Sequence, residues 1–256
     1  MADGVVLYGR VEGVVTLTLN RPEKRNAMNG ELVEELTEGL ARARDDDDAR
    51  VVALRGAGKD FCSGADLAEL EKIADMGREE SIADAMRMGE LFVAMREHPL
   101  PIVAVVTGRA LAGGCGLATA CDLVVAHEEA QMGYPEVHLG FVPAMVMAIL
   151  RRKLGESRAF DLVTGGHRID AAEAHRIGLV NRLLPDQGFE DAVAELLSGL
   201  ASKPASALRL TKGLLYDLDD LGFEEGIRRG AEVNAEARRS PECREGVRRF
   251  LERARG

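Results

Sequence analysis

The chain has 256 residues, of which 46% are hydrophobic and 30% are charged, and its formal net charge is −10. This length is enough to bury one large core, and the composition excludes disordered and collagen-like classes. The negative charge argues against broad, nonspecific binding of nucleic acid.

The cysteine and histidine spacings predict neither disulfides nor a metal site. The 4 cysteines form no C-x-x-C pair, and the 5 histidines form no H-x-x-x-H pair. Met1 to Gly4 lack the basic start of a secretory signal. The apolar stretch from Phe141 to Leu150 is far shorter than the roughly twenty residues that span a bilayer. We therefore expect a cytoplasmic protein with reduced thiols.

The first fifty residues predict a hairpin followed by a helix. Val5–Tyr8 and Val14–Leu19 flank a Glu12-Gly13 turn, as in two paired strands. Asn29 is a good N-cap for a helix with one apolar face. The acidic run Asp45–Asp48 has no other metal ligands beside it, so it is interpreted as a solvated loop. The apolar face is formed by Leu32, Val33, Leu36 and Leu40.

The next fifty residues predict a strand, a loop and two helices. Val51–Arg55 has the composition of a strand, and the glycines after it open a loop over Phe61–Leu67. A second helix is expected from about Ser81 to Glu97 and ends before Pro99. The first helix would carry Leu67, Leu70, Ile73 and Ala74 on its apolar face.

The middle of the chain carries the residues that point to chemistry. Pro101–Val106 is typical of a buried strand, and the residues from Leu117 predict a helix, so Gly113 and Gly114 lie on a strand-to-helix turn. Amide groups at a helix N-terminus point toward negative charge, and glycines let a ligand carbonyl approach them. Pro135 stiffens the segment that presents the carboxylate of Glu136. Together these groups could stabilise and protonate an enolate.

The remainder predicts an α/β core with a helical C-terminal part. Leu123–Ala126 is expected to be a short strand, and the chain is expected to be mainly helical from Val142 to its end. We place the catalytic core at residues 1–198 and the helical, oligomerising region at residues 199–256. The basic triplet Arg151–Lys153 is interpreted as a solvated helix end.

Seven segments of the chain resemble, in their order and spacing, the crotonase, or enoyl-CoA hydratase/isomerase, family. The resemblance implies a spiral of β-β-α units, a homotrimer or dimer of trimers, and an acyl-CoA thioester as substrate. No separate cofactor or metal is implied, because coenzyme A is part of the substrate, and no nucleic acid or membrane partner is expected. The segments are Asn20–Asn29, Phe61–Leu67, Arg109–Ala118, Cys121–Leu123, Tyr134–Gly140, Thr164–Ala171 and Gly178–Asn181.

The resemblance also assigns site residues. The backbone amides of Ala65 and Gly113 would hold the thioester oxygen, and Glu136 would move the proton at the neighbouring carbon. The apolar neighbours Val137, Leu139 and Phe141 would raise the pKa of Glu136 if they bury it. His138 is interpreted as a supporting or a surface histidine rather than as a base. Residues implied to contact CoA or the acyl thioester are Lys24, Arg25, Ala27, Asp66, Leu67, Gly114, Phe250 and Arg253.

One departure from the family pattern leaves the reaction open. Two-glutamate hydratases carry a glutamate after Gly-Gly-Cys, where this chain has Gly116. We rank hydration of a 2-enoyl-CoA first, because the overall resemblance is to hydratases. Isomerisation of a 3-enoyl-CoA to a 2-enoyl-CoA ranks second, since it needs one carboxylate, which Glu136 supplies. A CoA-thioester binder without turnover is the third reading.

Overall fold

The computed structural model describes residues 4–73 and 76–255, so the predicted helical position Ala74 lies outside the described residues. The strands are β1 (Val6–Val11), β2 (Val14–Leu19), β3 (Val51–Gly56), β4 (Ile102–Val106), β5 (Arg109–Leu111), β6 (Leu123–His127), β7 (Gln131–Gly133), β8 (Arg168–Asp170) and β9 (Arg182–Leu184). The α-helices are α1 (Gly30–Arg44), α2 (Leu67–Ile73), α3 (Arg78–Glu97), α4 (Gly113–Ala120), α5 (Ala144–Leu154), α6 (Glu156–Gly165), α7 (Ala171–Arg176), α8 (Phe189–Ala201), α9 (Ala205–Asp217), α10 (Phe223–Arg239) and α11 (Pro241–Arg255). Short 3₁₀ helices are η1 (Pro22–Lys24), η2 (Pro135–Leu139) and η3 (Leu218–Asp220).

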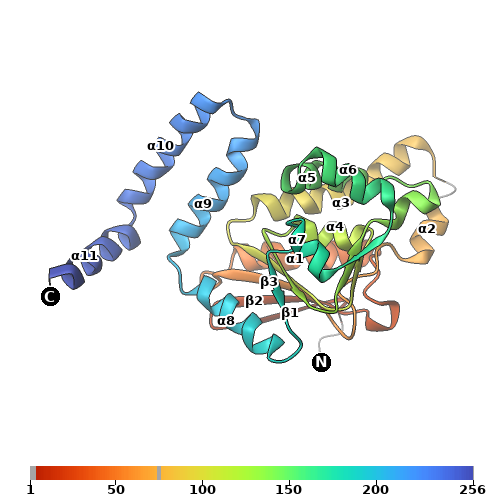
Figure 1. The fold of residues 1–256 in the computed structure, drawn as a ribbon, viewed down its shortest axis with the longest axis horizontal. Helices are drawn as coiled ribbons and strands as arrows, with labels where there is room; N and C mark the ends of the chain where they lie inside the picture. The colour runs from red at the N-terminus through yellow and green to blue at the C-terminus, as the bar shows by residue number, and fades with distance from the viewer. Residues whose placement is uncertain (1–3, 74–75, 256) are drawn as a thin grey trace.

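A sheet in the order β1-β2-β3-β4-β6-β9 forms the centre of the molecule (Figure 1). The β1–β2 hairpin is antiparallel, and every later pair in this sheet is parallel. Alternate residues of each strand face opposite sides. Val52 and Leu54 join the core beneath α1 and α3, whereas Val51 and Ala53 pack with α8 on the other face.

A second, smaller sheet in the order β5-β7-β8 positions the site. β4 belongs to the large sheet and β5 to the small one, and the chain then enters α4. In the same way, β6 belongs to the large sheet and β7 to the small one, and the chain then enters η2. The repetition places the starts of α4 and η2 after neighbouring, parallel strands, with Leu111 opposite Gly133.

The predicted elements of the first half are confirmed with small shifts. Asn29 caps α1, because its side-chain oxygen accepts a hydrogen bond of 3.0 Å from the Leu32 amide. The glycines from Gly113 form the first turn of α4 rather than a turn before it. The expectation of a mainly helical chain from Val142 onward is confirmed, and the short strands β8 and β9 within it complete the two sheets.

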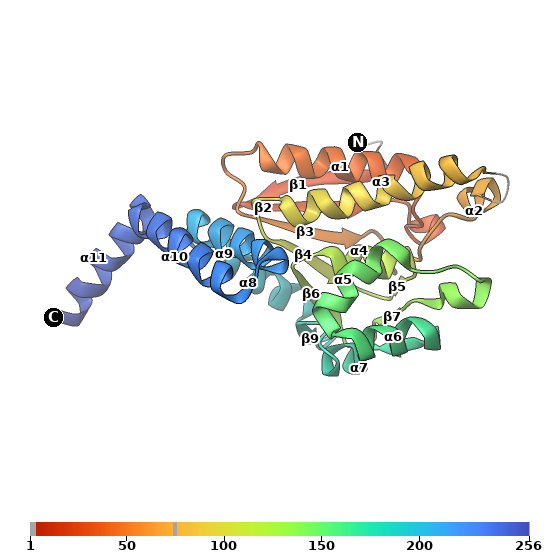
Figure 2. The same cartoon turned by 90° about the horizontal axis from the view of Figure 1, so that it is seen from above.

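The C-terminal helices α9, α10 and α11 extend away from the body in two perpendicular views (Figures 1 and 2). Gly199, where the sequence places the start of the C-terminal region, lies in α8, which still packs on the large sheet. No helix within the described residues is long and apolar enough to cross a membrane.

Candidate active site

The start of α4 lies against the loop that contains Cys62. A Cβ placed on Gly114 would lie 2.3 Å from the Cys62 carbonyl oxygen, so only glycine permits this approach. The loop is fixed to β5 by main-chain hydrogen bonds of 3.0 Å on either side of Cys62, from its own amide to Arg109 and from the Leu111 amide to its oxygen. The first turn of the helix is therefore held against a second, distant segment of the chain.

Two backbone amides remain available where these segments meet. A Cβ placed on Gly64 would lie 3.8 Å from the Gly113 nitrogen, which shows how closely the loops approach. The Met28 amide donates a hydrogen bond to the Gly64 oxygen, and the Met28 oxygen accepts one from the Asp66 amide. The Ala65 amide between them takes part in neither bond. Among the described residues, neither the Ala65 nor the Gly113 amide donates to a protein acceptor. The predicted pair of oxyanion donors is thus adjacent and free.

The residue before Gly113 is in an unusual conformation. Ala112 has φ 50° and ψ −129°, a backbone conformation that residues other than glycine rarely adopt. Its amide donates a 2.8 Å hydrogen bond to the Gly133 oxygen, and its oxygen accepts one of 2.9 Å from Gly116. These bonds hold the backbone in the turn that leaves the next amide unpaired. Sequence reasoning missed Ala112, since an alanine gives no local sign of positive φ.

The carboxylate of Glu136 lies close to the first turn of α4. Its Oε2 atom is buried and has no hydrogen-bond partner among the described residues. Burial raises the pKa of Glu136 above 4.5. Burial also raises the pKa of Cys115 to about 11, and the nearby Glu136 charge adds to this effect. Cys115 is fully buried with a raised pKa, so it is a packed residue and not a nucleophile.

Contacts on both sides of Glu136 position it. The hydroxyl groups of Tyr134 and Thr119 are 2.8 Å apart and fully buried, which ties η2 to α4. On the other side, His138 Nε2 lies 3.0 Å from the Gly166 oxygen at the end of α6. This contact agrees with the supporting role expected of His138.

The apolar neighbours of Glu136 keep much of their surface in solvent. The exposed fractions of Val137, Leu139 and Phe141 are 41%, 71% and 43%. Tyr134 and Cys115 are fully buried, and the Glu136 charge adds to the raised pKa of each. Two buried groups therefore lie near the carboxylate, and a role of the three apolar neighbours in its burial stays a prediction.

Gly116 faces an apolar wall. A Cβ placed there would lie 3.4 Å from Val146 Cγ2 and 3.5 Å from Phe92 Cζ, which are ordinary contact distances. Hydrocarbon side chains are thus the nearest neighbours of the position at which the sequence resemblance led us to expect a glutamate. Glu136 is an acidic group whose charge acts on Cys115 in the first turn of α4.

Comparison with known proteins agrees with this geometry. A family model described as enoyl-CoA hydratase/isomerase matches residues 9–255. A putative enoyl-CoA hydratase from Thermus thermophilus is 44% identical over 241 residues, covering 94% of this chain and 95% of that protein. The chain belongs to the enoyl-CoA hydratase/isomerase family.

Further relatives place the fold within the same family. A probable enoyl-CoA hydratase from Mycobacterium bovis is 32% identical and covers 99% of this chain and 97% of its own length. The crystal structure of an enoyl-CoA hydratase from Mycobacterium smegmatis superposes with a TM-score of 0.93 at 32% identity, covering 98% of this chain and 97% of that one. The fold is accordingly the crotonase spiral with a C-terminal helical extension.

Arg21 and Asn26 belong to the segment Asn20–Asn29, which is expected to bind CoA. Both residues connect this segment to the chain around the loop Phe61–Leu67, called the oxyanion loop below. Arg21 Nη2 lies 2.7 Å from Asp66 Oδ2, and Nη1 donates to the Ala27 oxygen. Asn26 is fully buried and donates to the Asp60 oxygen at 2.8 Å. The sequence analysis did not predict these roles of Arg21 and Asn26, because polar residues beside a proline are also typical of an ordinary surface turn.

The residues predicted to contact CoA fall into two groups. Lys24 and Arg25 are exposed beside Ala27, and Leu67 is 76% exposed at the start of α2, so these lie near the oxyanion loop. Asp66 lies there too, but its carboxylate binds Arg21 and the Ala68 amide, and the Arg21 hydrogen bond lowers its pKa. Their contacts with CoA stay predictions.

Phe250 and Arg253 form the second group. Both are exposed on α11, which lies far from α4 in both views (Figures 1 and 2). The described chain does not bring them to its own Glu136. Their predicted contact with CoA therefore requires a second copy of the chain.

Proposed function

We propose that this family member hydrates a 2-enoyl-CoA, with Glu136 as the acid/base and the Ala65 and Gly113 amides as oxyanion donors. The observation that carries the proposal is a buried carboxylate oxygen that has no hydrogen-bond partner among the described residues and lies close to the first turn of α4, where the free amides of Gly113 and Ala65 meet. Enolate formation requires a group that exchanges a proton and donors for the oxygen that becomes negative.

The proposed steps conserve protons and electrons. Ionised Glu136 takes a proton from water as the water oxygen attacks carbon 3 of the enoyl group. The electrons of the double bond move to the thioester oxygen, where hydrogen bonds from Ala65 and Gly113 stabilise the enolate. Protonated Glu136 then delivers its proton to carbon 2, which restores the carbonyl and the carboxylate.

Isomerisation of 3-enoyl-CoA to 2-enoyl-CoA is the second candidate, and a specific observation favours it. The atoms nearest to a Cβ on Gly116 belong to Phe92 and Val146, and Gly116 itself carries no carboxylate that could orient a water. Isomerisation needs only that Glu136 removes a proton from carbon 2 and returns one to carbon 4. The same amide pair would hold the intermediate dienolate oxygen.

Incubation in deuterated water separates the two reactions. The enzyme is supplied in parallel with a 2-enoyl-CoA and a 3-enoyl-CoA of equal length, and the products are analysed by mass spectrometry and NMR. Hydration gives a 3-hydroxyacyl-CoA that carries deuterium at carbon 2. Rapid conversion of the 3-enoyl-CoA to a product that carries deuterium at carbon 4 and no added water would show that the enzyme is an isomerase and not a hydratase. Binding of both thioesters without turnover would contradict both reactions.

A further inference from the structure

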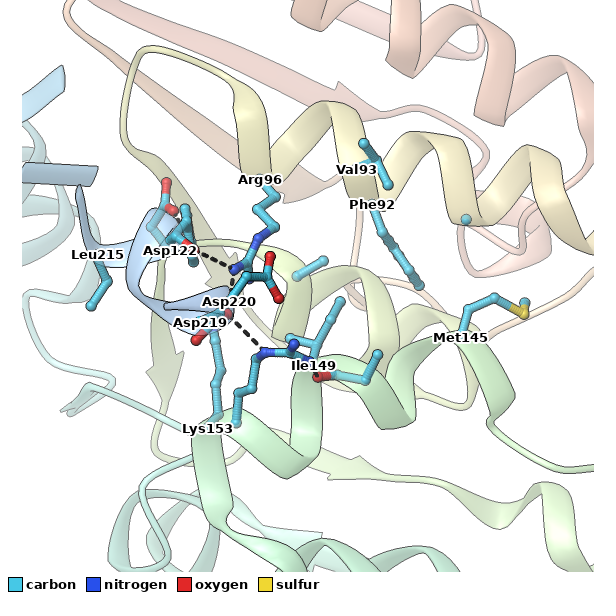
Figure 3. Close-up of a pocket in the computed structure, with 15 residues that line it drawn as sticks. Phe92, Val93, Arg96, Asp122, Met145, Ile149, Lys153, Leu215, Asp219 and Asp220 are labelled. Carbon is cyan, nitrogen blue, oxygen red and sulfur yellow. Dashed lines mark hydrogen bonds and ion pairs between the residues drawn. The ribbon is translucent and has the colours of Figure 1, made fainter. Parts of the chain in front are cut away.

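A cavity of about 400 Å³ lies between α3, α5 and the η3 turn that follows α9 (Figure 3). This volume falls within the range of about 300–1,000 Å³ that is typical of small-molecule pockets. The lining near the start of α5 is apolar, where Phe92 comes from α3 and Met145 from α5. Three further lining residues, Gly89, Ala120 and Ala148, carry no more than a methyl group, which leaves the space open.

The opposite end of the cavity is polar, and its formal charges cancel. Asp219 Oδ2 lies 2.7 Å from Arg152 Nε and also binds Arg96. Lys153, which the sequence indicated to be part of a solvated helix end, is half-buried and donates a 2.5 Å hydrogen bond to the Cys121 oxygen. Nothing at this end therefore favours a charged ligand over hydrocarbon. The charged lining residues are Asp122, Asp219, Asp220, Arg96, Arg152 and Lys153.

Phe92 belongs both to the wall of the cavity and to the surroundings of α4. Its side chain lines the cavity, and its Cζ atom lies 3.5 Å from a Cβ placed on Gly116. Ala120 lies one helical turn after Gly116 on the same side of α4, and it lines the cavity as well. Phe92 is buried, so its ring fills the space beside this face of the helix.

The reacting carbons of the proposed substrate would lie close to this ring. The Glu136 charge acts on Cys115, so the carbons that exchange protons with Glu136 lie beside the first turn of α4. Gly116 is about 4.5 Å along the helix axis from the oxyanion amide of Gly113, at about 1.5 Å per residue. An acyl chain that continues along α4 therefore meets the Phe92 ring within about one helical turn.

We propose that Phe92 sets the length of the acyl group, because its ring stands between the start of α4 and the apolar end of the cavity. The inference rests on the proposed acyl-CoA function and deepens it: the substrate is a short acyl group that ends in hydrocarbon. Without the ring, a longer hydrocarbon chain would enter the cavity. The affinity would then rise about fourfold for each methylene that leaves water.

Calorimetric binding of saturated acyl-CoA thioesters, in even steps from butyryl-CoA to decanoyl-CoA, tests the proposal without turnover. In the unaltered protein, the affinity should stop rising with length once the chain meets the Phe92 ring. In Phe92→Ala the rise should continue over further methylenes. The ratio of decanoyl-CoA affinity to butyryl-CoA affinity should therefore be at least about tenfold larger in the variant than in the unaltered protein.

Filling the cavity tests whether the longer chain enters it. Ala148 lines the cavity from α5, and Ala144 is exposed one helical turn before it. Adding Ala148→Leu to Phe92→Ala should remove most of the increase in the ratio, because the leucine takes up the space that the chain would occupy. Adding Ala144→Leu instead is the matched control, and it should leave the ratio raised.

An equal ratio in Phe92→Ala and the unaltered protein would overturn the inference. An increase that Ala148→Leu leaves intact would overturn it too, since the chain would then lie outside the cavity. Failure of every thioester to bind to the unaltered protein would instead overturn the acyl-CoA function on which the inference rests. Thermal unfolding checks each variant. Phe92→Leu, which loses less packing and should raise the ratio by a smaller factor, replaces Phe92→Ala if the latter is unfolded.

Discussion

At the residue scale, Glu136 combines a catalytic position with an unfavourable environment. Its buried oxygen has no partner among the described residues, and burial raises its pKa above 4.5. A carboxylate in this state is a stronger base than one in water, which suits proton transfer near neutral pH. The same burial makes the ionised form costly to the fold.

The first prediction concerns turnover. Replacing Glu136 by glutamine should lower kcat about 10²- to 10⁴-fold, because the amide cannot exchange the proton. In the unaltered enzyme, kcat should fall as the pH drops through the raised pKa of Glu136, since the ionised form begins the reaction. Steady-state kinetics from acidic to neutral pH measure both effects. Undiminished turnover in Glu136→Gln would remove this residue from the mechanism.

The second prediction concerns stability. Because the carboxyl pKa is raised in the folded state, that state binds the proton more tightly than the unfolded chain does. The free energy of unfolding should therefore decrease as the pH rises from 4.5 through the folded-state pKa. Glu136→Gln removes this penalty, so the variant should be more stable than the unaltered protein at neutral pH and about equally stable in acid. Denaturant unfolding at several pH values tests this, with the exposed Glu38→Gln as the control.

At the element scale, two of the three glycines in α4, Gly114 and Gly116, have opposite surroundings. A Cβ on Gly114 would collide with Cys62 at 2.3 Å, whereas one on Gly116 would make contacts of 3.4 and 3.5 Å with Val146 and Phe92. The third prediction is that Gly116→Ala stabilises the protein by about 0.5–1 kcal/mol through helix propensity. Gly114→Ala should destabilise it by about 1–3 kcal/mol through overpacking. Urea unfolding of the two variants, each serving as the control for the other, should give changes of opposite sign.

Elements with strong local patterns could be predicted from the sequence, and short elements could not. The hairpin and α1 are set by β-branched alternation and by the Asn29 cap. The three-residue strands β5, β7, β8 and β9 are too short to show an alternating pattern in the sequence, and they form only where distant segments pair. The same limit applies to the site. Gly113 and Glu136 carry family motifs, but the positive φ of Ala112 and the inward position of Lys153 depend on distant contacts.

At the scale of the whole molecule, Lys212 joins the C-terminal helices to the body. Its ammonium is buried on α9 and donates to the oxygens of Met95 and Leu100 at 2.9 and 3.1 Å. It also pairs with Asp122 at 2.7 Å, and Asp122 accepts a further 2.7 Å bond from the Tyr216 hydroxyl. A single buried cation thus connects the end of α3, the start of β6 and α9.

The fourth prediction follows from this pairing. Lys212→Met should lower the free energy of unfolding by about 3 kcal/mol, because the half-buried Asp122 carboxylate loses the ammonium that neutralises its charge. Hydrogen exchange should then be faster in α9 than in the central sheet. The exposed Lys203→Met should leave both measurements unchanged. Uniform protection in Lys212→Met would mean that α9 is held by other contacts.

The mutual fixing of the two loops has an entropic consequence. Cys62 is hydrogen-bonded to Arg109 and Leu111 in β5, and Ala112 is hydrogen-bonded to Gly133 in β7. The free amides of Ala65 and Gly113 therefore belong to segments that folding has already ordered. A ligand oxygen that accepts from both amides would not have to order these loops as it binds.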